Sequence, residues 1–466
     1  MECSELKIQN GTSTTNGGSI FYTAKIAIIA AVGGLLFGYD TAVISGAIPF
    51  LEDFFKLSAA QLGFAVSSVV LGCLLGSSVA GSLADRFGRK KVMISASVMF
   101  LISAILTSIP NSLVLFDAAR FVTGLAIGLS SPVSPMYIAE MSPAKIRGGL
   151  VTLNQLAITF GIVAAYLMDW GIAMIGNPEW QTNYAWRWMF ASATIPAVIL
   201  IVGLLFIPES PRWLLKEGHI EKAKGILIKI GGPSHADREL REIEGALVEE
   251  KASIGQLLRP GFRWALLIGI LIMFFSQITG MNAIYMYTSK LLLEVGFASK
   301  SSALLGMVLV GVVNFVSTIL AISIIDKVGR RILMLIAPAG MCLCMVAVAI
   351  GFSGHLLIPA LMLTAILVFV FFFAIGVGPQ AWLVTSEIFP TKVRGRAMSI
   401  CTFSLWASSF VANLIFPRCL EWSQTGTFCL FAVACALMLI FVYKLVPETK
   451  GKTLEEIETF WRTYEK

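Results

Sequence analysis

Long apolar stretches separated by short polar ones run along most of the 466-residue chain. A helix needs about 20 mainly apolar residues to cross a bilayer, and longer helices can tilt or protrude. Twelve stretches qualify, at approximately residues 25–48, 62–83, 92–109, 113–138, 150–172, 187–207, 264–294, 302–325, 332–352, 359–386, 398–417 and 427–446. The pattern predicts an all-α membrane protein with twelve transmembrane helices.

Composition and charge distribution favour the same class. With 57% hydrophobic residues, 14% charged residues and a mean hydropathy of +0.82, the chain is too apolar for an ordinary soluble protein. If the polar N-terminal tail lies in the cytoplasm, the loops and termini on that side hold 29 of the 35 Lys and Arg residues. This bias predicts two cytoplasmic termini in a multi-pass protein of the plasma (inner) membrane. The net charge of +7 therefore needs no nucleic-acid partner.

Signatures of an enzyme, a metal site or a cofactor site do not stand out. Most of the eight cysteines fall within predicted spans, which favours small core residues over disulfides or metal ligands. The three histidines, His219, His235 and His355, lie outside the predicted spans, so a proton route through histidine is not expected. The chain also lacks a nucleophile elbow and an HExxH motif. We expect no enzymatic activity, no catalytic residues, no cofactor and no metal.

The polar loops show that the chain repeats itself. "DRFGRK" at 85–90 matches "DKVGRR" at 326–331, and "EMSPAKIRG" at 140–148 matches "EIFPTKVRG" at 387–395. "PESPR", from residue 208, matches "PETKG", from residue 447. Three matches in the same order predict two related six-helix halves, as in many transporters.

This repeat divides the chain into five regions. We expect a cytosolic tail (1–24), an N-terminal six-helix bundle (25–207), a cytosolic helical linker (208–263), a C-terminal six-helix bundle (264–446) and a second cytosolic tail (447–466). Within the linker, Ser234 is placed as the N-cap of a helix that carries Leu240, Ile243 and Leu247 on one face.

The motifs resemble those of a known family. The paired loops and the six-plus-six pattern resemble the major facilitator superfamily. "GSLADRFGRKK", "SPAKIRGG", "PESPRWLL", "SEIFPTKVRGR" and "PETKGKTLEEIE" together resemble its sugar porter family, over about residues 25 to 458. That family includes bacterial proton-coupled monosaccharide symporters and animal facilitative glucose carriers. The resemblance implies a transporter with pseudo-symmetric halves.

Two charged residues stand out inside the predicted spans. Asp40 lies about eight residues from the outer end of the first span, near Ile48, and Arg120 lies eight residues into the fourth. Equal depth predicts that they pair, because an uncompensated charge in a bilayer is costly. Gly124 and Gly128 follow at intervals of four, a stripe that allows close helix approach.

The pair has two interpretations. It could be a structural link between two helices. Alternatively, Asp40 binds a proton with an affinity that depends on whether Arg120 is near, which would couple protonation to conformation. The resemblance favours the second, since proton-coupled sugar porters carry an aspartate at this position and facilitative relatives do not.

Amides and tryptophans inside the spans are candidates for sugar binding. A sugar needs many directional hydrogen bonds and offers a C–H face that stacks on aromatic rings, although Asn and Gln also serve as interhelical hydrogen-bonding groups. The resemblance places the following residues on substrate-contacting positions: Phe37, Gln155, Gln277, Asn282, Tyr287, Asn314, Trp382 and Trp406. It also implies that Gly280 lets the seventh span unwind.

Some positions depart from the family pattern. Ser276, Met286 and Leu405 replace a glutamine, a tyrosine and an amide, and Ile162 stands where some relatives carry another amide. These changes leave the identity of the sugar open, and a polyol such as an inositol remains an alternative.

The repeated loops hold charges that recur at corresponding places in both halves. Ordinary solvated loops are one interpretation. The resemblance implies a cytoplasmic gate that locks the inner ends of the halves in the outward-open state, formed by Asp85, Arg86, Arg89, Glu140, Arg147 and Arg212 in the first half and Asp326, Arg330, Arg331, Glu387 and Arg394 in the second.

Together these features predict proton:monosaccharide symport by alternating access. The alternatives are a facilitative sugar or polyol uniporter, in which Asp40 is structural, and a membrane sugar sensor, for which the tail after Pro447 is short. The expected partners are a small sugar, protons and the lipid bilayer, with no obligate protein partner.

Overall fold

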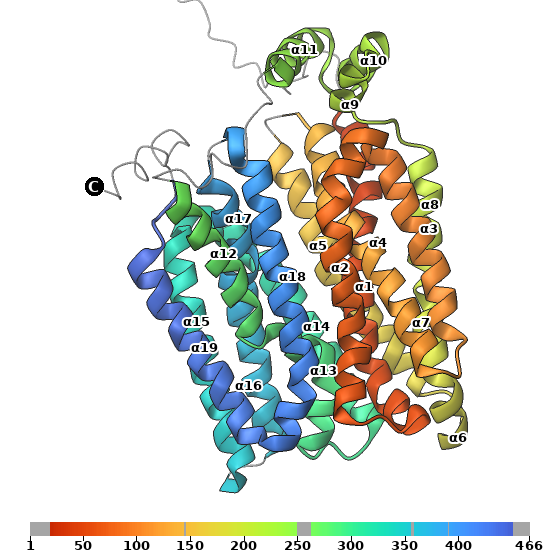
Figure 1. Ribbon diagram of the computed structural model, residues 1–466, viewed down its shortest axis with the longest axis vertical. Helices are drawn as coiled ribbons and strands as arrows, with labels where there is room; N and C mark the ends of the chain where they lie inside the picture. Colours follow the sequence, from red (N-terminus) through yellow and green to blue (C-terminus); the bar gives the residue numbers. More distant parts are fainter. Residues whose placement is uncertain (1–18, 144–145, 249–261, 356–357, 390, 451–466) are drawn as a thin grey trace, which may run out of the picture.

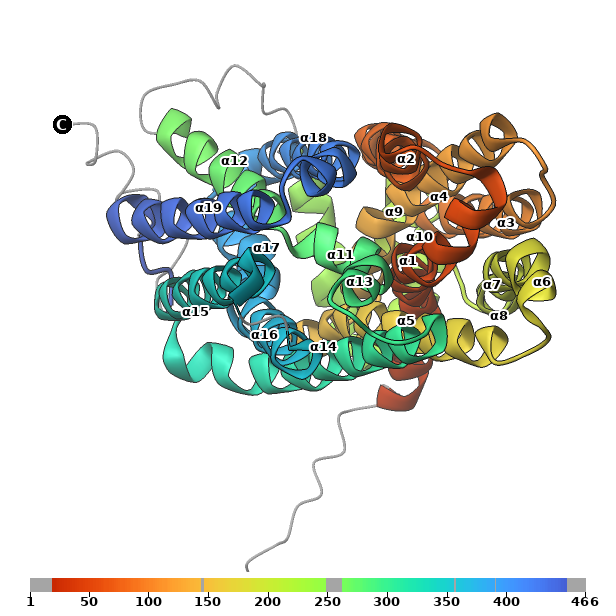
Figure 2. The ribbon, with the colours of Figure 1, turned by 90° about the horizontal axis from the view of Figure 1, so that it is seen from below.

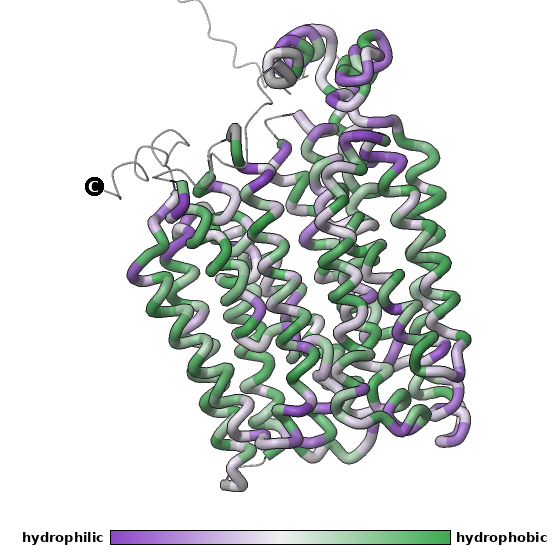
Figure 3. The backbone as a smooth tube through the Cα atoms, viewed as in Figure 1, coloured by the Kyte–Doolittle hydropathy of each residue, from purple (hydrophilic) through white to green (hydrophobic). Residues whose placement is uncertain are grey.

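The computed structural model describes residues 19–143, 146–248, 262–355, 358–389 and 391–450. Twelve helical spans in this part of the chain are long and apolar enough to cross a membrane, which confirms the predicted class. Figure 3 shows apolar residues along the lengths of these helices and polar residues gathered at their ends.

The first half contains six spans. Five are single helices and the sixth is built from four consecutive helical segments. The elements are α1 (Ile20–Phe55), α2 (Ala59–Phe87), α3 (Arg89–Ser108), α4 (Leu113–Glu140), α5 (Arg147–Ala173), α6 (Pro178–Trp180), η1 (Gln181–Ala185), α7 (Trp186–Ser192) and α8 (Thr194–Leu205).

The second half also has six spans, and three of them are built from more than one helical segment. Its elements are α12 (Phe262–Ile278), α13 (Met281–Glu294), α14 (Lys300–Val328), α15 (Arg330–Ile350), η3 (Gly351–His355), α16 (Pro359–Phe372), η4 (Phe373–Val377), α17 (Gly378–Glu387), α18 (Thr391–Trp422) and α19 (Gln424–Leu445). Figure 2 shows the two halves side by side. The most extensive contacts between them are made by three helix pairs, namely α2 with α18, α5 with α14 and α1 with α13.

Three linker helices cover one end of the bundle, which we call the linker end (Figure 1). They are α9 (Pro211–Lys216), α10 (Ile220–Gly231) and α11 (Pro233–Val248). Leu227, Ala236 and Leu240 form a small apolar core between them. The predicted N-cap at Ser234 is wrong, because α11 begins at Pro233 and the Gly232 carbonyl accepts the first helical hydrogen bond, from the Ala236 N–H. The side chain of Leu247 lies outside the described residues.

The first helix is longer than its apolar run indicated. The structure starts α1 at Ile20, inside the predicted tail, and continues it past Pro49 to Phe55. Pro49 does not end the helix, and Lys56 terminates it with a left-handed conformation at φ 53°. The estimate of eight residues between Asp40 and the helix end is therefore too small.

The glycine stripe on α4 meets a second one on α2. A Cβ atom on Gly72 would lie 2.8 Å from the Gly124 Cα and would clash with the Phe121 carbonyl. A Cβ atom on Gly128 would lie 2.5 Å from the Cys73 carbonyl. The backbones of α2 and α4 are thus in direct contact, as the stripe predicted.

We expect Gly72→Ala to destabilise the first half, because the added methyl group must push α4 away. Overpacking of this kind costs about 1–3 kcal/mol. Thermal unfolding in detergent should occur at a lower temperature. Gly81→Ala is the matched control on the same helix, since a Cβ there meets nothing within 4 Å. Equal stability of the two variants would contradict the tight contact.

Candidate transport site

The Asp40 and Arg120 side chains meet in the interior of the first half. The Arg120 Nη1 donates to the Asp40 Oδ1 at 2.6 Å. The Arg120 side chain is 0% exposed and the Asp40 side chain is 7% exposed. The Phe190 ring lies 5.2 Å from the guanidinium and adds a cation–π contact. Packing of α1 against α4 forms this pair, although the residue count from the helix ends was wrong for α1.

The ion pair leaves several polar atoms unused. The Asp40 Oδ2 and the Arg120 Nε and Nη2 are enclosed and have no hydrogen-bond partner among the described residues. Breaking a buried pair by removing one member typically costs about 3–5 kcal/mol, because the other charge stays unpaired. The free carboxylate oxygen is a place where a proton can add.

A break in the seventh span exposes an amide cluster in the second half. Gly280 adopts φ 95°, a left-handed conformation that separates α12 from α13 as predicted. The Asn282 side chain donates to the Gln277 Oε1 at 2.5 Å and to the Ser409 Oγ at 2.7 Å. The Gln277 amide in turn donates to the Ser276 hydroxyl at 3.0 Å. Three elements thus contribute hydrogen-bonding groups to one cluster.

Aromatic rings connect this cluster to the first half. The Phe37 ring of α1 lies 5.9 Å from the Trp406 ring of α18. Trp406 precedes Ser409 by three residues, so both lie on one face of α18. The Trp406 Nε1 is buried without a partner among the described residues. Phe37, Trp406, Asn282 and Gln277 thus form a set that spans both halves, held by the Phe37–Trp406 ring contact and by the Asn282–Ser409 bond to the helix that carries Trp406.

The other predicted site residues do not join this set by described contacts. Gln155 is partly buried on α5, Asn314 is buried on α14, and Trp382 of α17 is 41% exposed. Tyr287 is fully buried and donates to the Asn413 carbonyl at 2.9 Å, within the second half. Their roles in binding stay predictions.

Sequence reasoning missed Ser409 as a member of the cluster. The signal was present in "WASSF", because a hydroxyl three residues after Trp406 falls on the same helix face. Gln380 of α17 is a buried amide whose nitrogen and oxygen both lack a hydrogen-bond partner among the described residues.

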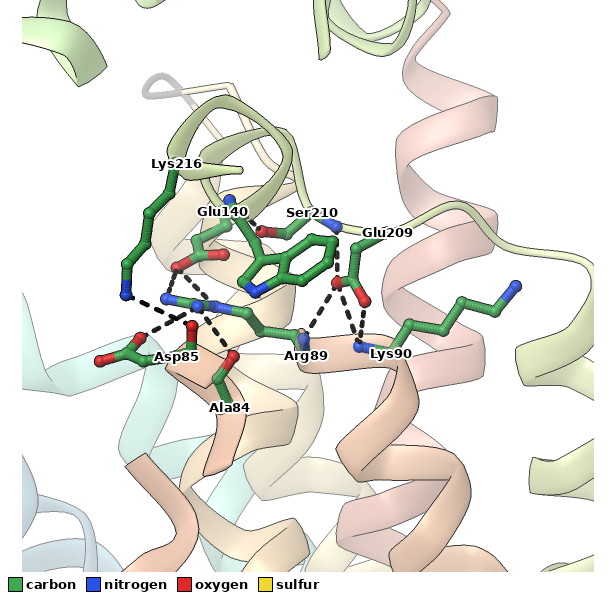
Figure 4. A network of polar contacts seen from close by, with 9 residues as sticks. Ala84, Asp85, Arg89, Lys90, Glu140, Glu209, Ser210 and Lys216 are labelled. Atoms are coloured by element: carbon green, nitrogen blue, oxygen red, sulfur yellow. Dashed lines mark hydrogen bonds and ion pairs between the residues drawn. The ribbon is translucent and has the colours of Figure 1, made fainter. Parts of the chain in front are cut away.

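At the linker end, a charge network ties the first half together (Figure 4). The Arg89 guanidinium pairs with Glu140 at 2.9 Å and with Asp85 at 3.0 Å. The Glu209 carboxylate accepts the backbone N–H groups of Arg89 and Lys90 at 3.0 and 3.1 Å. Glu209 thus caps the N-terminus of α3, where backbone donors favour an anion.

The second half repeats this arrangement. Glu448 accepts the backbone N–H groups of Arg330 and Arg331, each at 3.1 Å. The Arg330 guanidinium pairs with Glu387 at 3.4 Å. The repeat seen in the sequence is therefore also a repeat of contacts, and sequence reasoning missed its two capping glutamates.

The remaining gate candidates also make contacts within their own half or with the linker. Arg147 pairs with Glu239 of α11 at 3.9 Å, and Arg394 donates to the Phe389 carbonyl. Arg331 donates to the Tyr443 carbonyl at 2.7 Å, and Arg86 lies over Phe87. The Asp326 side chain lies outside the described residues. A gate that joins the halves at this end, including Arg212, stays a prediction.

The described contacts that cross between the halves include a set at the opposite end, which we call the clasp. Lys290 pairs with Glu52 at 2.6 Å, and Lys300 pairs with Asp53 at 2.5 Å. The Ser289 hydroxyl donates to the Ser45 carbonyl. Each contact joins α1 to α13 or α14, so the clasp ties the two halves together at this end.

These features define a twelve-span membrane transporter with two repeated halves and a polar interior. A family model for "Sugar (and other) transporter" matches residues 26–461, so the chain belongs to the sugar transporter family, as its motifs predicted. It is therefore a transporter and not an enzyme.

Characterised relatives match along almost the whole chain. The arabinose-proton symporter of Bacillus subtilis is 40% identical over 463 residues, covering 99% of this chain and 100% of that protein. The D-xylose-proton symporter of Escherichia coli is 37% identical over 474 residues, covering 94% and 96%. The inward-open structure of the E. coli xylose transporter XylE matches with a TM-score of 0.83 at 35% identity, covering 94% of this chain and 99% of that chain.

We expect Lys290→Glu to open the clasp, because it sets two carboxylates face to face. The pair is partly exposed and contributes about 0–1 kcal/mol, so the change should be a shift in population and not unfolding. In a Ser45→Cys background, which keeps the carbonyl that accepts from Ser289, maleimide should label the new thiol several-fold faster. Adding Glu52→Lys should restore slow labelling. Lys56→Glu is the control, and equally fast labelling there would contradict a specific role for the clasp.

Proposed function

We propose that the protein carries a monosaccharide together with a proton by alternating access. The observation that carries the proposal is the Asp40–Arg120 pair, enclosed within the first half and with a free carboxylate oxygen. A proton on that oxygen would neutralise Asp40 and release Arg120. The relatives named as arabinose-proton and D-xylose-proton symporters support the same coupling here.

In this proposal the sugar binds between the halves. Phe37 and Trp406 would stack on its C–H face, and Gln277 and Asn282 would exchange their mutual hydrogen bond for bonds to its hydroxyls. Gln155, Asn314, Tyr287 and Trp382 would complete the site. Because two amides of the family pattern are absent at Ser276 and Leu405, we expect fewer hydrogen bonds to the sugar.

We propose that this structure is an inward-open state, because the clasp joins the halves at one end while the described charge networks at the linker end stay within each half. The linker end would face the cytoplasm of a cell whose plasma membrane holds the protein, with both termini on that side. The clasp would close the outer end, and the charge networks of the two halves would join only in the outward-open state. Alternating access then amounts to shifting a two-state equilibrium.

A facilitative uniporter is the second candidate, in which the ion pair is only structural. Proton flux separates the two. Vesicles loaded with the protein and supplied with labelled pentoses, hexoses and polyols, with and without a pH gradient, should accumulate at least one monosaccharide only when the gradient is present. Uptake that never exceeds equilibration in either condition would favour the uniporter.

We expect Asp40→Asn to abolish uphill sugar accumulation while sugar exchange partly survives. The amide cannot bind the coupling proton, although it can still accept from Arg120. Counterflow and gradient-driven uptake in the same vesicles measure the two activities. Asp169→Asn, which alters another buried acid of the first half, serves as the control. If Asp40→Asn still accumulates sugar, the coupling role is refuted.

We expect Gln155→Ala and Trp382→Ala to weaken sugar binding by roughly tenfold, which corresponds to the loss of about one hydrogen bond or ring contact. Equilibrium binding of the transported sugar to purified protein tests this. Trp422→Ala, which removes a 77% exposed ring at the end of α18, should leave affinity unchanged. Unaltered affinity in both test variants would place the site elsewhere.

A further inference from the structure

A second acid lies beside Arg120 on its own helix. Asp117 precedes Arg120 by three residues on α4, and side chains at this spacing are neighbours on a helix surface. The charge of Arg120 acts on the Asp117 carboxyl. The Asp117 Oδ1 is enclosed and has no hydrogen-bond partner among the described residues. An enclosed acceptor without a donor is uncommon and calls for an explanation.

Arg120 has unused donors that match this acceptor. One of its nitrogens, Nη1, donates to Asp40, whereas Nε and Nη2 have no acceptor in the described part of the chain. A guanidinium presents five N–H donors in a planar fork and can engage more than one carboxylate. The site therefore contains one cation, two acids and one ion pair.

The helix terminus alone does not explain Asp117. Acids are favoured near a helix N-terminus, but the effect is confined to the first turn. Asp117 is the fifth residue of α4, which begins at Leu113. Described groups that interact with Arg120 from other helices include the Cys73 thiol of α2 and the Phe190 ring of α7, and neither is a carboxylate. Asp117 is thus a second acid that is available to Arg120.

We propose that Asp117 is the alternative partner of Arg120, a positioning residue that receives the guanidinium when a proton neutralises Asp40. The proton binds the free Asp40 Oδ2, the Nη1–Oδ1 ion pair loses its charge, and the guanidinium turns toward the Asp117 Oδ1. Arg120 faces the Asp40 carboxylate before the step and the Asp117 carboxylate after it, and the bound proton takes the site from a net charge of −1 to 0. The coupling part of this inference rests on the proposed proton symport.

An alternative partner for Arg120 lowers the energetic cost of protonating Asp40. A buried guanidinium without a counter-charge is costly in a membrane protein, and this cost would oppose protonation of Asp40. A second carboxylate within reach lowers that cost. Release of Arg120 from α1 then leaves the cation held on α4, so α1 is free to move relative to α4 while the charge is still compensated.

A double-mutant cycle tests the alternative pairing without any transport assay. Thermal midpoints are measured in detergent for the full-length wild type, Asp40→Asn, Asp117→Asn and the double variant. We expect each single change to leave one acid for Arg120, and the double change to lower the midpoint by more than the sum of the two. Asp169→Asn replaces Asp117→Asn in the control cycle, where the effects should add.

Two outcomes of the cycle would overturn the proposal. Additive losses in the Asp117 cycle would mean that Arg120 does not use Asp117 when Asp40 is neutral. A loss in Asp117→Asn alone as large as in the double variant would make Asp117 a permanent structural counter-charge and not an alternative partner.

The pH profile of sugar uptake tests the role in coupling. In Asp117→Asn only Asp40 remains to hold Arg120, so a proton competes less well for Asp40. Half-maximal uptake should therefore move to lower pH by about one unit, which is a tenfold higher proton concentration. Asp117→Glu keeps a carboxylate at this position and should return the pH profile most of the way to that of the wild type. An unchanged profile would overturn the role. If wild-type uptake ignores the proton gradient, the proposed symport fails, and the stability cycle still decides the pairing.

Discussion

The buried pairing of Asp40 with Arg120 is the contact on which the rest of the structure depends. Neither charge could stay at this depth alone, so α1 and α4 must present them to each other. The position of α4 is in turn set by the backbone contact between Gly72 and Gly124, which leaves no room for a side chain. Close packing of α2 and α4 thus determines the position of Arg120, and the ion pair with Arg120 determines the position of Asp40.

Each half carries its own charge network, anchored on the backbone at the start of a helix. Glu209 and Glu448 each bind two backbone N–H groups at the start of a helix, so the tie is made to the main chain and not to a mobile side chain. The clasp between the halves combines two partly exposed ion pairs with one buried hydrogen bond, from the Ser289 hydroxyl to the Ser45 carbonyl. Such internal ties suit motion of each half as a rigid body.

Hydropathy and short motifs predicted much of this architecture. The twelve spans, the break at Gly280 and the glycine contact follow from local patterns, each within a single stretch of sequence. The repeat follows from comparing short motifs in the two halves. The pairing of Asp40 with Arg120 was predicted because each is a rare charge inside a span, although the structure shows that the reasoning about its depth was wrong for α1, which continues through Pro49. The clasp was not predicted, because Glu52 and Lys290 are ordinary charges near helix ends and only packing of distant helices brings them together. Glu209 was overlooked for a related reason, since capping another helix leaves no periodic signal.

The exposure of the clasp has a consequence for the environment of the protein. Lys300 and Asp53 are 32% and 49% exposed at their side chains, so dissolved ions reach both partners. Attraction between such charges is screened over about 8 Å at physiological ionic strength and over shorter distances in brine. The interior pair is shielded from the same ions. A rise in salt concentration at that face would therefore weaken the clasp without reaching the Asp40–Arg120 pair, and the balance between conformations would vary with the ionic strength there.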